Sequence, residues 1–254
     1  MDFAPILRDI KPTKKEEQQL NKTVQQIVSK IKVKDAVPML GGSGAKKTWL
    51  KNTHDIDIYV KFKHSIYKDK SGEIADILHQ ALKKRFQGIS RLHGSRDYFQ
   101  LKHRDYTIEI VPILDISQAQ QAKNTTAFSK LHVDYVLKEI RKNKKLSDEI
   151  RLVKQFAKAN HVYGAESYIR GFSGYVLELL TSYYGSFTSL MKVAAKWKPI
   201  TVIGSKTAAN KLNPAKRAPL IVIDPVQPDR NAAAALSEEK FYDLIMAART
   251  FLKH

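Results

Sequence analysis

Two short apolar segments that carry acidic residues, preceded by a glycine–serine turn, constrain this chain more than any other feature. Residues 54–62 alternate and are rich in β-branched and aromatic side chains, so the sequence predicts a strand there. Side chains alternate between the two faces of a strand, so Asp55 and Asp57 share one face, and the isoleucine after each points into the core. Two neighbouring carboxylates repel each other unless a cation lies between them.

A third carboxylate, Glu109, lies in another alternating segment. Residues 106–111 predict a strand in which Glu109 faces away from its apolar neighbours. Magnesium prefers oxygen ligands and keeps several waters, so a few carboxylates and substrate phosphates suffice to hold it. Two such ions, roughly 3.5–4 Å apart, stabilise the attacking and the leaving oxygen of an in-line displacement. Asp55, Asp57 and Glu109 together therefore favour a two-magnesium site of a nucleotidyltransferase over a solvated outer face.

A glycine-rich turn that contains Gly42 and Ser43 precedes the acidic pair. Glycines let backbone N–H groups approach a phosphate, and the start of a helix adds a favourable dipole. Ser43 offers a hydroxyl, and Lys46 and Lys47 offer positive charge. The turn does not follow the G-x-x-x-x-G-K-[ST] pattern of a P-loop. Eleven residues separate Ser43 from Asp55, and the combination is far more specific than a glycine pair alone.

These residues carry a family resemblance. Residues 42–50 and 55–58 resemble the signature of the DNA polymerase β-type nucleotidyltransferases. Other segments resemble the central domain of the archaeal class I CCA-adding enzymes, which are tRNA nucleotidyltransferases: 151–160, 162–166, 169–175, 184–187, 224–226 and 229–233. The resemblance covers nearly the whole chain. It implies an α/β palm with a mixed sheet over residues 1–115, which is the catalytic domain, and a mainly helical, nucleotide-selecting central domain over residues 116–254.

The resemblance also implies roles for individual residues. The acidic triad matches the catalytic metal ligands, and Ser43 matches the serine that contacts phosphate. His132 matches a histidine near the incoming nucleotide. The residues that match contacts to the triphosphate, the base and the sugar are Lys154, Tyr163 and Arg230. The implied reaction is attack of a tRNA 3′-hydroxyl on the α-phosphate of CTP or ATP, with two magnesium ions and release of pyrophosphate.

The chain departs from the family pattern at several points. Gly44 stands where a tyrosine or threonine is usual, so we expect a looser phosphate turn. Glu109 stands where aspartate is usual, which keeps the carboxylate but lengthens it by one methylene. Arg96 stands where related sequences have a histidine near the nucleotide. The family also continues into further domains that hold the tRNA. We therefore expect a compact enzyme, the catalytic subunit of a split enzyme with a second subunit, or a part of a longer protein.

Other functions stay open on the same residues. One alternative is another template-independent RNA nucleotidyltransferase, of the poly(A) or oligoadenylate type. The other is a non-catalytic RNA-binding protein on the same fold, which the acidic triad disfavours.

Composition points independently to a polyanionic partner. The formal net charge is +19, and nucleic acid is the usual partner of so basic a chain. The residues expected to meet RNA are Lys192, Lys196, Trp197 and Lys198, with Trp197 stacking on an unpaired terminal base. Tyr183 and Tyr184 are expected to be packed in the core. No apolar run approaches the length of a membrane span, so we expect a cytoplasmic protein without a membrane partner.

Periodicity predicts the remaining elements. A capping box at Thr13 and Glu16 opens a helix, and Ser71 caps another. Pro112 is expected to end the strand that carries Glu109. Further strands are expected at 36–40, 89–92, 98–102 and 220–223, helices at 128–142, 147–160, 173–184, 186–197 and 238–252, and a loop or hairpin at 205–219.

Overall fold

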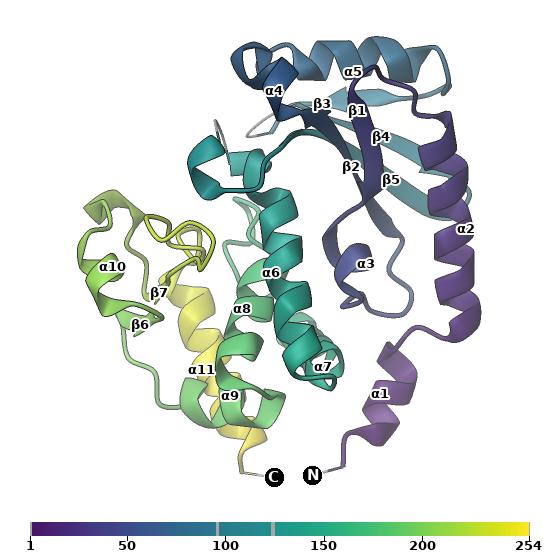
Figure 1. The fold of residues 1–254 in the computed structure, drawn as a ribbon. Helices are drawn as coiled ribbons and strands as arrows, with labels where there is room; N and C mark the ends of the chain where they lie inside the picture. The colour runs from purple at the N-terminus through teal and green to yellow at the C-terminus, as the bar shows by residue number, and fades with distance from the viewer. Residues whose placement is uncertain (1, 95–96, 123–124, 254) are drawn as a thin grey trace. The chain divides into compact units, whose positions relative to one another are not determined.

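The computed structural model describes residues 2–94, 97–122 and 125–253 and is drawn in Figure 1. The chain forms two compact units: a sheet unit, residues 11–134, and a helical unit, residues 1–10 with 135–254. The expected boundary lay between residues 115 and 116. The units instead divide within the helix α6 (Ser129–Lys142), and the first ten residues belong with the helical unit.

The sheet unit contains the mixed sheet that the sequence predicts. Its strands are β1 (Ala36–Leu40), β2 (Asp55–Lys63), β3 (Ser90–Leu92), β4 (Tyr98–His103) and β5 (Tyr106–Asp115). They lie in the order β1-β2-β5-β4-β3. β2 and β5 are parallel, and the other neighbouring pairs are antiparallel. The two predicted acidic strands are therefore adjacent at the centre of the sheet.

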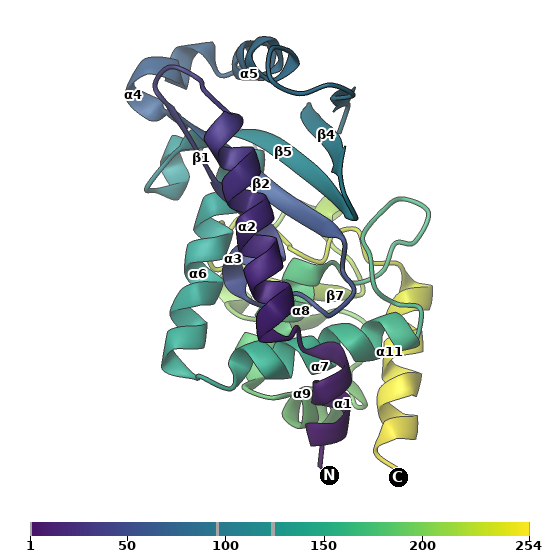
Figure 2. The ribbon, with the colours of Figure 1, turned by 90° about the vertical axis from the view of Figure 1, so that its right-hand side faces the viewer.

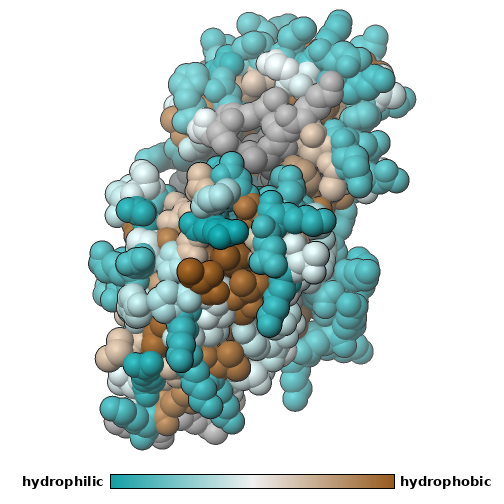
Figure 3. Space-filling model, turned by 90° about the vertical axis from the view of Figure 1, so that its left-hand side faces the viewer, coloured by the Kyte–Doolittle hydropathy of each residue, from teal (hydrophilic) through white to brown (hydrophobic). Residues whose placement is uncertain are grey.

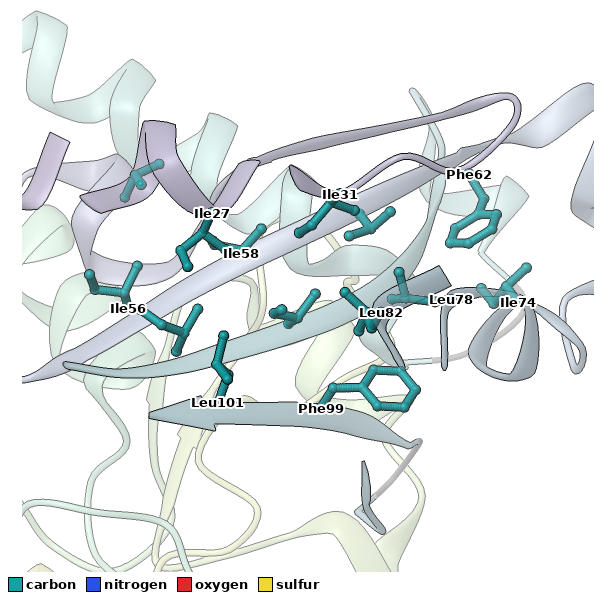
Figure 4. Packing of buried hydrophobic residues seen from close by; sticks show 14 of the residues in the cluster. Ile27, Ile31, Ile56, Ile58, Phe62, Ile74, Leu78, Leu82, Phe99 and Leu101 are labelled. Carbon is teal, nitrogen blue, oxygen red and sulfur yellow. The ribbon is translucent and has the colours of Figure 1, made fainter. Parts of the chain in front are cut away.

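Two helices cover one face of this sheet, α2 (Lys14–Lys30) and α5 (Ile74–Lys83). Their apolar side chains and those of the sheet form one buried cluster, of which Figure 4 labels several members. The predicted capping box is confirmed: the Thr13 hydroxyl accepts from the Glu16 N–H, and the Glu16 carboxylate accepts from the Thr13 N–H. Short helices complete the unit: α3 (Gly42–Lys46), α4 (His64–Tyr67), and 3-10 turns at Lys68–Lys70, Ala119–Gln121 and Thr125–Phe128.

Two local predictions in the sheet unit are wrong. Ser71 does not cap α5, which begins at Ile74 after Glu73 and has no side-chain cap. Pro112 does not end β5, which continues to Asp115 and pairs with β2 along that stretch. β4 pairs with β5 only as far as Ile110, so Pro112 lies where β5 has a single paired neighbour. A strand accommodates proline at such an edge because one side needs no N–H donor.

The described part of the helical unit contains six further α-helices and a small parallel sheet. They are α1 (Ala4–Ile10), α7 (Leu146–Ala159), α8 (Gly174–Tyr184), α9 (Phe187–Ala194), α10 (Lys206–Asn210), α11 (Glu238–Phe251), β6 (Thr201–Ile203) and β7 (Leu220–Val222). Figure 2 shows α1 beside α7. The Phe3 ring lies 5.3 Å from Phe187 and 6.3 Å from Phe251, which fastens the start of the chain to α9 and α11.

One segment of the helical unit is more regular than predicted. The stretch expected to be a loop or hairpin holds α10 and a 3-10 turn at Pro214–Lys216. Ala209 and Leu212 from this stretch are buried against Ile221 and Ile223. An apolar pattern this short has too few repeats to mark a helix. None of the helices in the described part of the chain is both long and apolar enough to cross a membrane.

Candidate active site

The register of the two central strands brings the predicted carboxylates together. Ile56 and Ile58 are 2% and 0% exposed, so the odd-numbered residues of β2 turn to the other face, as predicted. Asp57 lies directly opposite Glu109, and Asp55 lies opposite Thr107, one step further along the same face. The three carboxylates therefore form one acidic group on two adjacent parallel strands.

The environment of Glu109 is electrostatically unusual. Burial raises the pKa of the Glu109 carboxyl above its usual 4.5, and the charges of Asp57 and Asp55 raise it further. A side-chain hydrogen bond with Gln100, its cross-strand neighbour on β4, acts in the opposite direction. Negative charge at Glu109 thus carries a cost that a bound cation would relieve.

The glycine turn packs directly against this acidic group. The backbone N–H of Gly41 donates to the Asp57 carbonyl at 2.8 Å, and that of Gly42 donates to the Tyr59 hydroxyl at 3.2 Å. Gly42 has a φ of 52°, and a methyl group on its Cα would overlap the Asp57 carboxylate. Only glycine combines that backbone conformation with so close an approach.

The remaining side chains of the turn are less uniform than the sequence suggests. Ser43 is half-buried in the first turn of α3, whereas Lys46 is buried and Lys47 is exposed at the helix end. A methyl group at Gly44 would lie 3.0 Å from Leu40, so a larger residue there would require Leu40 to move. Arg96, the other noted departure, lies outside the described residues.

The donor set suits a divalent cation, although the side chains are not gathered around one. Among residues 2–94, 97–122 and 125–253, no group of three or more acidic, histidine or cysteine side chains is arranged to hold a metal ion. The Asp57 carboxylate is turned toward Gly42. Carboxylate oxygens on one face of the sheet nevertheless fit the ligand preference of magnesium. Burial and the neighbouring Asp57 and Asp55 charges both raise the pKa of Glu109, and charges of the same sign act in this direction when carboxylates are clustered.

His132 lies apart from the acidic strands in sequence, on α6. It is half-buried, and its ring stacks with Phe128, with centroids 6.2 Å apart and an interplanar angle of 18°. This contact fixes the plane of the imidazole.

Within the helical unit, the structure brings Lys154 and Tyr163 together at the start of α8. A methyl group at Gly174 would lie 2.9 Å from the Tyr163 hydroxyl and 3.8 Å from the Lys154 Cε. The Lys154 ammonium lies 2.7 Å from Glu178, and both side chains are almost fully buried. The Lys158 ammonium lies 5.1 Å from the centre of the Tyr163 ring, a cation–π distance.

Arg230 is held by a second buried carboxylate, Asp224. The guanidinium donates to Asp224 Oδ2 at 2.8 Å, and the Tyr175 hydroxyl and the Val226 N–H donate to Oδ1 at 3.1 and 2.9 Å. Asp224 is fully buried, whereas the Arg230 side chain is 35% exposed. Burial and the neighbouring Asp224 charge raise the pKa of the Tyr175 hydroxyl, so this hydroxyl stays a donor.

Sequence reasoning missed the two buried carboxylates that hold these cations. Glu178 lies within an apolar run of α8, where a charged residue is a visible anomaly. Asp224 stands in a segment that carries the family resemblance, but its partner could not be read from the sequence.

The expected RNA-contacting residues divide into two groups. Lys192, Lys196 and Lys198 are exposed. Trp197 is only 5% exposed and stacks on Phe241 of α11, with ring centroids 6.2 Å apart and an interplanar angle of 2°. The predicted stacking of a base on Trp197 is therefore wrong for this structure. Tyr183 departs in the opposite direction, because it was expected in the core and is 61% exposed.

Comparison with known sequences finds relatives over the whole chain. Residues 148–254 match the family described as tRNA nucleotidyltransferase, second domain. The CCA-adding enzyme of Nanoarchaeum equitans is 38% identical, and the match covers 100% of this chain and 65% of that relative. The CCA-adding enzyme of Sulfurisphaera tokodaii is 36% identical over 98% of this chain and 58% of its own length. This chain thus spans somewhat more than half the length of these curated relatives.

Solved structures share the fold at low sequence identity. The Cid1 poly(U) polymerase with Mg and 3′-dATP bound gives a TM-score of 0.75 at 15% identity, covering 98% of this chain and 92% of that one. A chain of the CdnC:HORMA-deltaN complex of E. coli MS115-1 gives 0.69 at 18% identity, covering 97% and 87%.

The mixed sheet, its acidic strand pair and these structural matches define a polymerase β-type nucleotidyltransferase fold, as the sequence predicts. Within that class, the sequence matches are more specific than the structural ones. Residues 148–254 match the tRNA nucleotidyltransferase family, and the chain is similar in sequence to archaeal CCA-adding enzymes over nearly its whole length.

Proposed function

We propose that this protein transfers CMP and AMP from CTP and ATP to the 3′ end of tRNA, in the cytoplasm. The observation that carries the proposal is the register that sets Asp57 opposite Glu109, with Asp55 on the same face and the glycine turn against Asp57. The relatives named CCA-adding enzymes support the choice of tRNA as acceptor.

In this reaction a bond forms between the RNA 3′-oxygen and the α-phosphorus, and the bond to the β-phosphate breaks to release pyrophosphate. Asp55, Asp57 and Glu109 hold two magnesium ions in this proposal. When bound, magnesium supplies charge neutralisation and lowers the pKa of the attacking hydroxyl. Most of the acceleration comes from positioning and charge neutralisation, as in other phosphoryl transfers.

The protein's own groups bind and orient the nucleotide in this proposal. The glycine turn at Gly42 offers backbone N–H groups and the Ser43 hydroxyl to phosphate oxygens, with Lys46 close by in α3. His132 lies near the nucleotide. Lys154 and Tyr163 contact the triphosphate and sugar.

Arg230 reads the edge of the base. Asp224 keeps its guanidinium in one orientation, and a fixed hydrogen-bonding group rejects bases that leave it unpaired. Lys192, Lys196 and Lys198 contact RNA phosphates in this proposal, which predicts that tRNA affinity falls with salt.

The direct test is an extension assay at single-nucleotide resolution. The substrate is a tRNA that lacks its 3′ CCA, with magnesium and with CTP, ATP, GTP or UTP singly and together. We expect three added residues only when CTP and ATP are both present. Asp57→Asn should lower the rate at least about 100-fold, since metal ligands contribute several kcal/mol to transition-state stabilisation.

A matched control is Asp115→Asn, because Asp115 is an exposed carboxylate at the other end of β5, paired with Lys61 at 3.4 Å. This variant should retain activity.

Other outcomes would select the alternatives. Long tails of A alone would favour a poly(A)-type transferase, and addition of only C or only A would indicate a specialised half-reaction. Binding of tRNA without extension would refute a self-sufficient enzyme. Extension restored by a second chain would then identify a split enzyme, and its continued absence would favour the non-catalytic RNA-binding alternative.

A further inference from the structure

A pocket on the helical unit lies outside the proposed nucleotide contacts. Its volume is about 280 Å³. Leu179 and Tyr183 stand one turn apart on α8 and line it, together with Tyr135 from α6 and Ile203 from β6. Pro225 and Pro228 follow β7 and complete the apolar lining.

The size and lining of this pocket suit a single aromatic ring. Sites for whole small-molecule ligands measure about 300–1,000 Å³, so this pocket is at the lower limit of that range. Its wall at Asp224 carries a carboxylate that already accepts hydrogen bonds from Tyr175, Val226 and Arg230. A ring that enters the pocket therefore meets aromatic and proline faces and a carboxylate whose charge Arg230 balances.

Tyr183 gives the pocket an accessible stacking surface. It is 61% exposed, although burial of an aromatic ring of this size normally stabilises a protein. The Tyr184 ring meets it edge-to-face at 5.1 Å and so supports its position. Unpaired bases stack on aromatic rings of this kind, which are fixed in position and exposed to solvent.

Positive charge lies next to the pocket. Ser205 lines it, and the next residue, Lys206, is exposed, as are Lys211 and Arg217 further along the segment. On the face seen in Figure 3, hydrophobic side chains gather among hydrophilic ones. Single-stranded RNA requires this combination, because its phosphates bind cations while its bases stack on apolar rings.

We propose that this pocket binds one unpaired base of the RNA acceptor, stacked on Tyr183, while Lys206 contacts an adjacent phosphate. The inference rests on the proposed function only in taking RNA as the substrate. It adds a second point of attachment for RNA, apart from the residues that hold the incoming nucleotide.

The test is RNA binding by Tyr183 variants, followed by fluorescence anisotropy. The probes are a labelled single-stranded RNA octanucleotide and a blunt RNA duplex of the same sequence. Tyr183→Ala should weaken binding of the single strand about 5- to 150-fold, because stacking contributes about 1–3 kcal/mol per base. Binding of the duplex should not change, and Tyr183→Phe should keep most of the affinity because the ring remains.

Two further variants separate stacking from general effects. Tyr168→Ala is the matched control, since Tyr168 is 85% exposed and does not line the pocket, and its affinity should equal that of the wild type. Lys206→Ala should make the plot of log affinity against log salt concentration less steep, by the amount that about one phosphate contact contributes.

Two results would overturn the inference. One is equal single-strand affinity in Tyr183→Ala and the wild type. The other is a raised KM for CTP or ATP with unchanged RNA affinity, which would assign the pocket to the incoming nucleotide. Repeating the titration in Asp57→Asn separates this inference from the proposed function. Tyr183-dependent binding without extension by the wild type would leave the inference standing while the proposed function fails.

Discussion

Replacing Glu178 by glutamine tests whether the helical unit depends on its buried ion pair. The Lys154 ammonium and the Glu178 carboxylate lie 2.7 Å apart, and their side chains are 5% and 0% exposed. Glu178→Gln removes the carboxylate from beside a buried ammonium, and breaking such a pair costs about 3–5 kcal/mol. For a protein of this size each kcal/mol lowers Tm by about 2–4 °C, so we expect a fall of roughly 6–20 °C.

A double variant separates stability from catalysis. Lys154→Met with Glu178→Leu replaces both charges by apolar groups of similar size, a change that is often neutral or stabilising. We therefore expect its Tm to return close to that of the wild type. If Lys154 contacts the triphosphate, this folded variant should still fail in the tRNA extension assay, and its KM for nucleotide should rise.

The matched control is an exposed pair of equal length. Lys142 and Glu139 on α6 also lie 2.7 Å apart, but their side chains are 60% and 19% exposed. Glu139→Gln should cost no more than about 1 kcal/mol, because water screens exposed pairs. Thermal unfolding followed by circular dichroism measures all the variants. The reasoning is refuted if Glu178→Gln has the same Tm as the wild type, or if the Tm of the double variant is as low as that of Glu178→Gln.

Three further changes test the rest of the site. Burial and the neighbouring aspartates raise the pKa of Glu109 in the folded protein. The folded protein therefore loses stability relative to the unfolded chain as the pH rises from 4.5 through this raised pKa. Without divalent cations, the Tm of Glu109→Gln should thus exceed that of the wild type at neutral pH and equal it below pH 4.5. Identical Tm values at every pH would contradict this. Asp224→Asn should raise KM for nucleotide more than it lowers kcat, because Arg230 loses its fixed orientation; an unchanged KM would count against that role. Gly42→Ala should lower stability by at least about 1–3 kcal/mol in denaturant unfolding, since it meets Asp57 and strains a positive φ; wild-type stability would refute the clash.

The sequence predicts the faces of the strands but not the register between them. Alternation alone assigns Asp57 and Glu109 to faces opposite their buried neighbours. The pairing of these two residues depends on a parallel contact between strands separated by two other strands in the chain. No local pattern specifies such a contact. The sequence groups the three carboxylates only because their chemistry suits magnesium, and the family resemblance supports the same grouping.

The aromatic residues show why burial was harder to predict than secondary structure. Trp197 follows α9 within a lysine-rich stretch, and its local surroundings favour exposure. Its burial comes from Phe241, which lies on the last helix of the chain. Tyr183 precedes a helix end at Gly185, where the chain turns and leaves the ring in solvent. Both outcomes depend on tertiary contacts that periodicity does not contain.

The residues proposed to bind metal and nucleotide carry opposite charges in the two units. The sheet unit gathers three carboxylates, and burial together with the charges of Asp57 and Asp55 raises the pKa of Glu109, so this unit is suited to bind cations. The helical unit offers Lys154 and Arg230, each already held by a buried carboxylate, Glu178 or Asp224. Under the proposed function, a triphosphate that reaches Lys154 replaces one anionic partner of this cation by another, and Glu178 compensates its charge when the nucleotide departs. We infer that the buried carboxylates lower the cost of an empty site at the expense of affinity for each nucleotide, and the proposed function requires such successive binding and release.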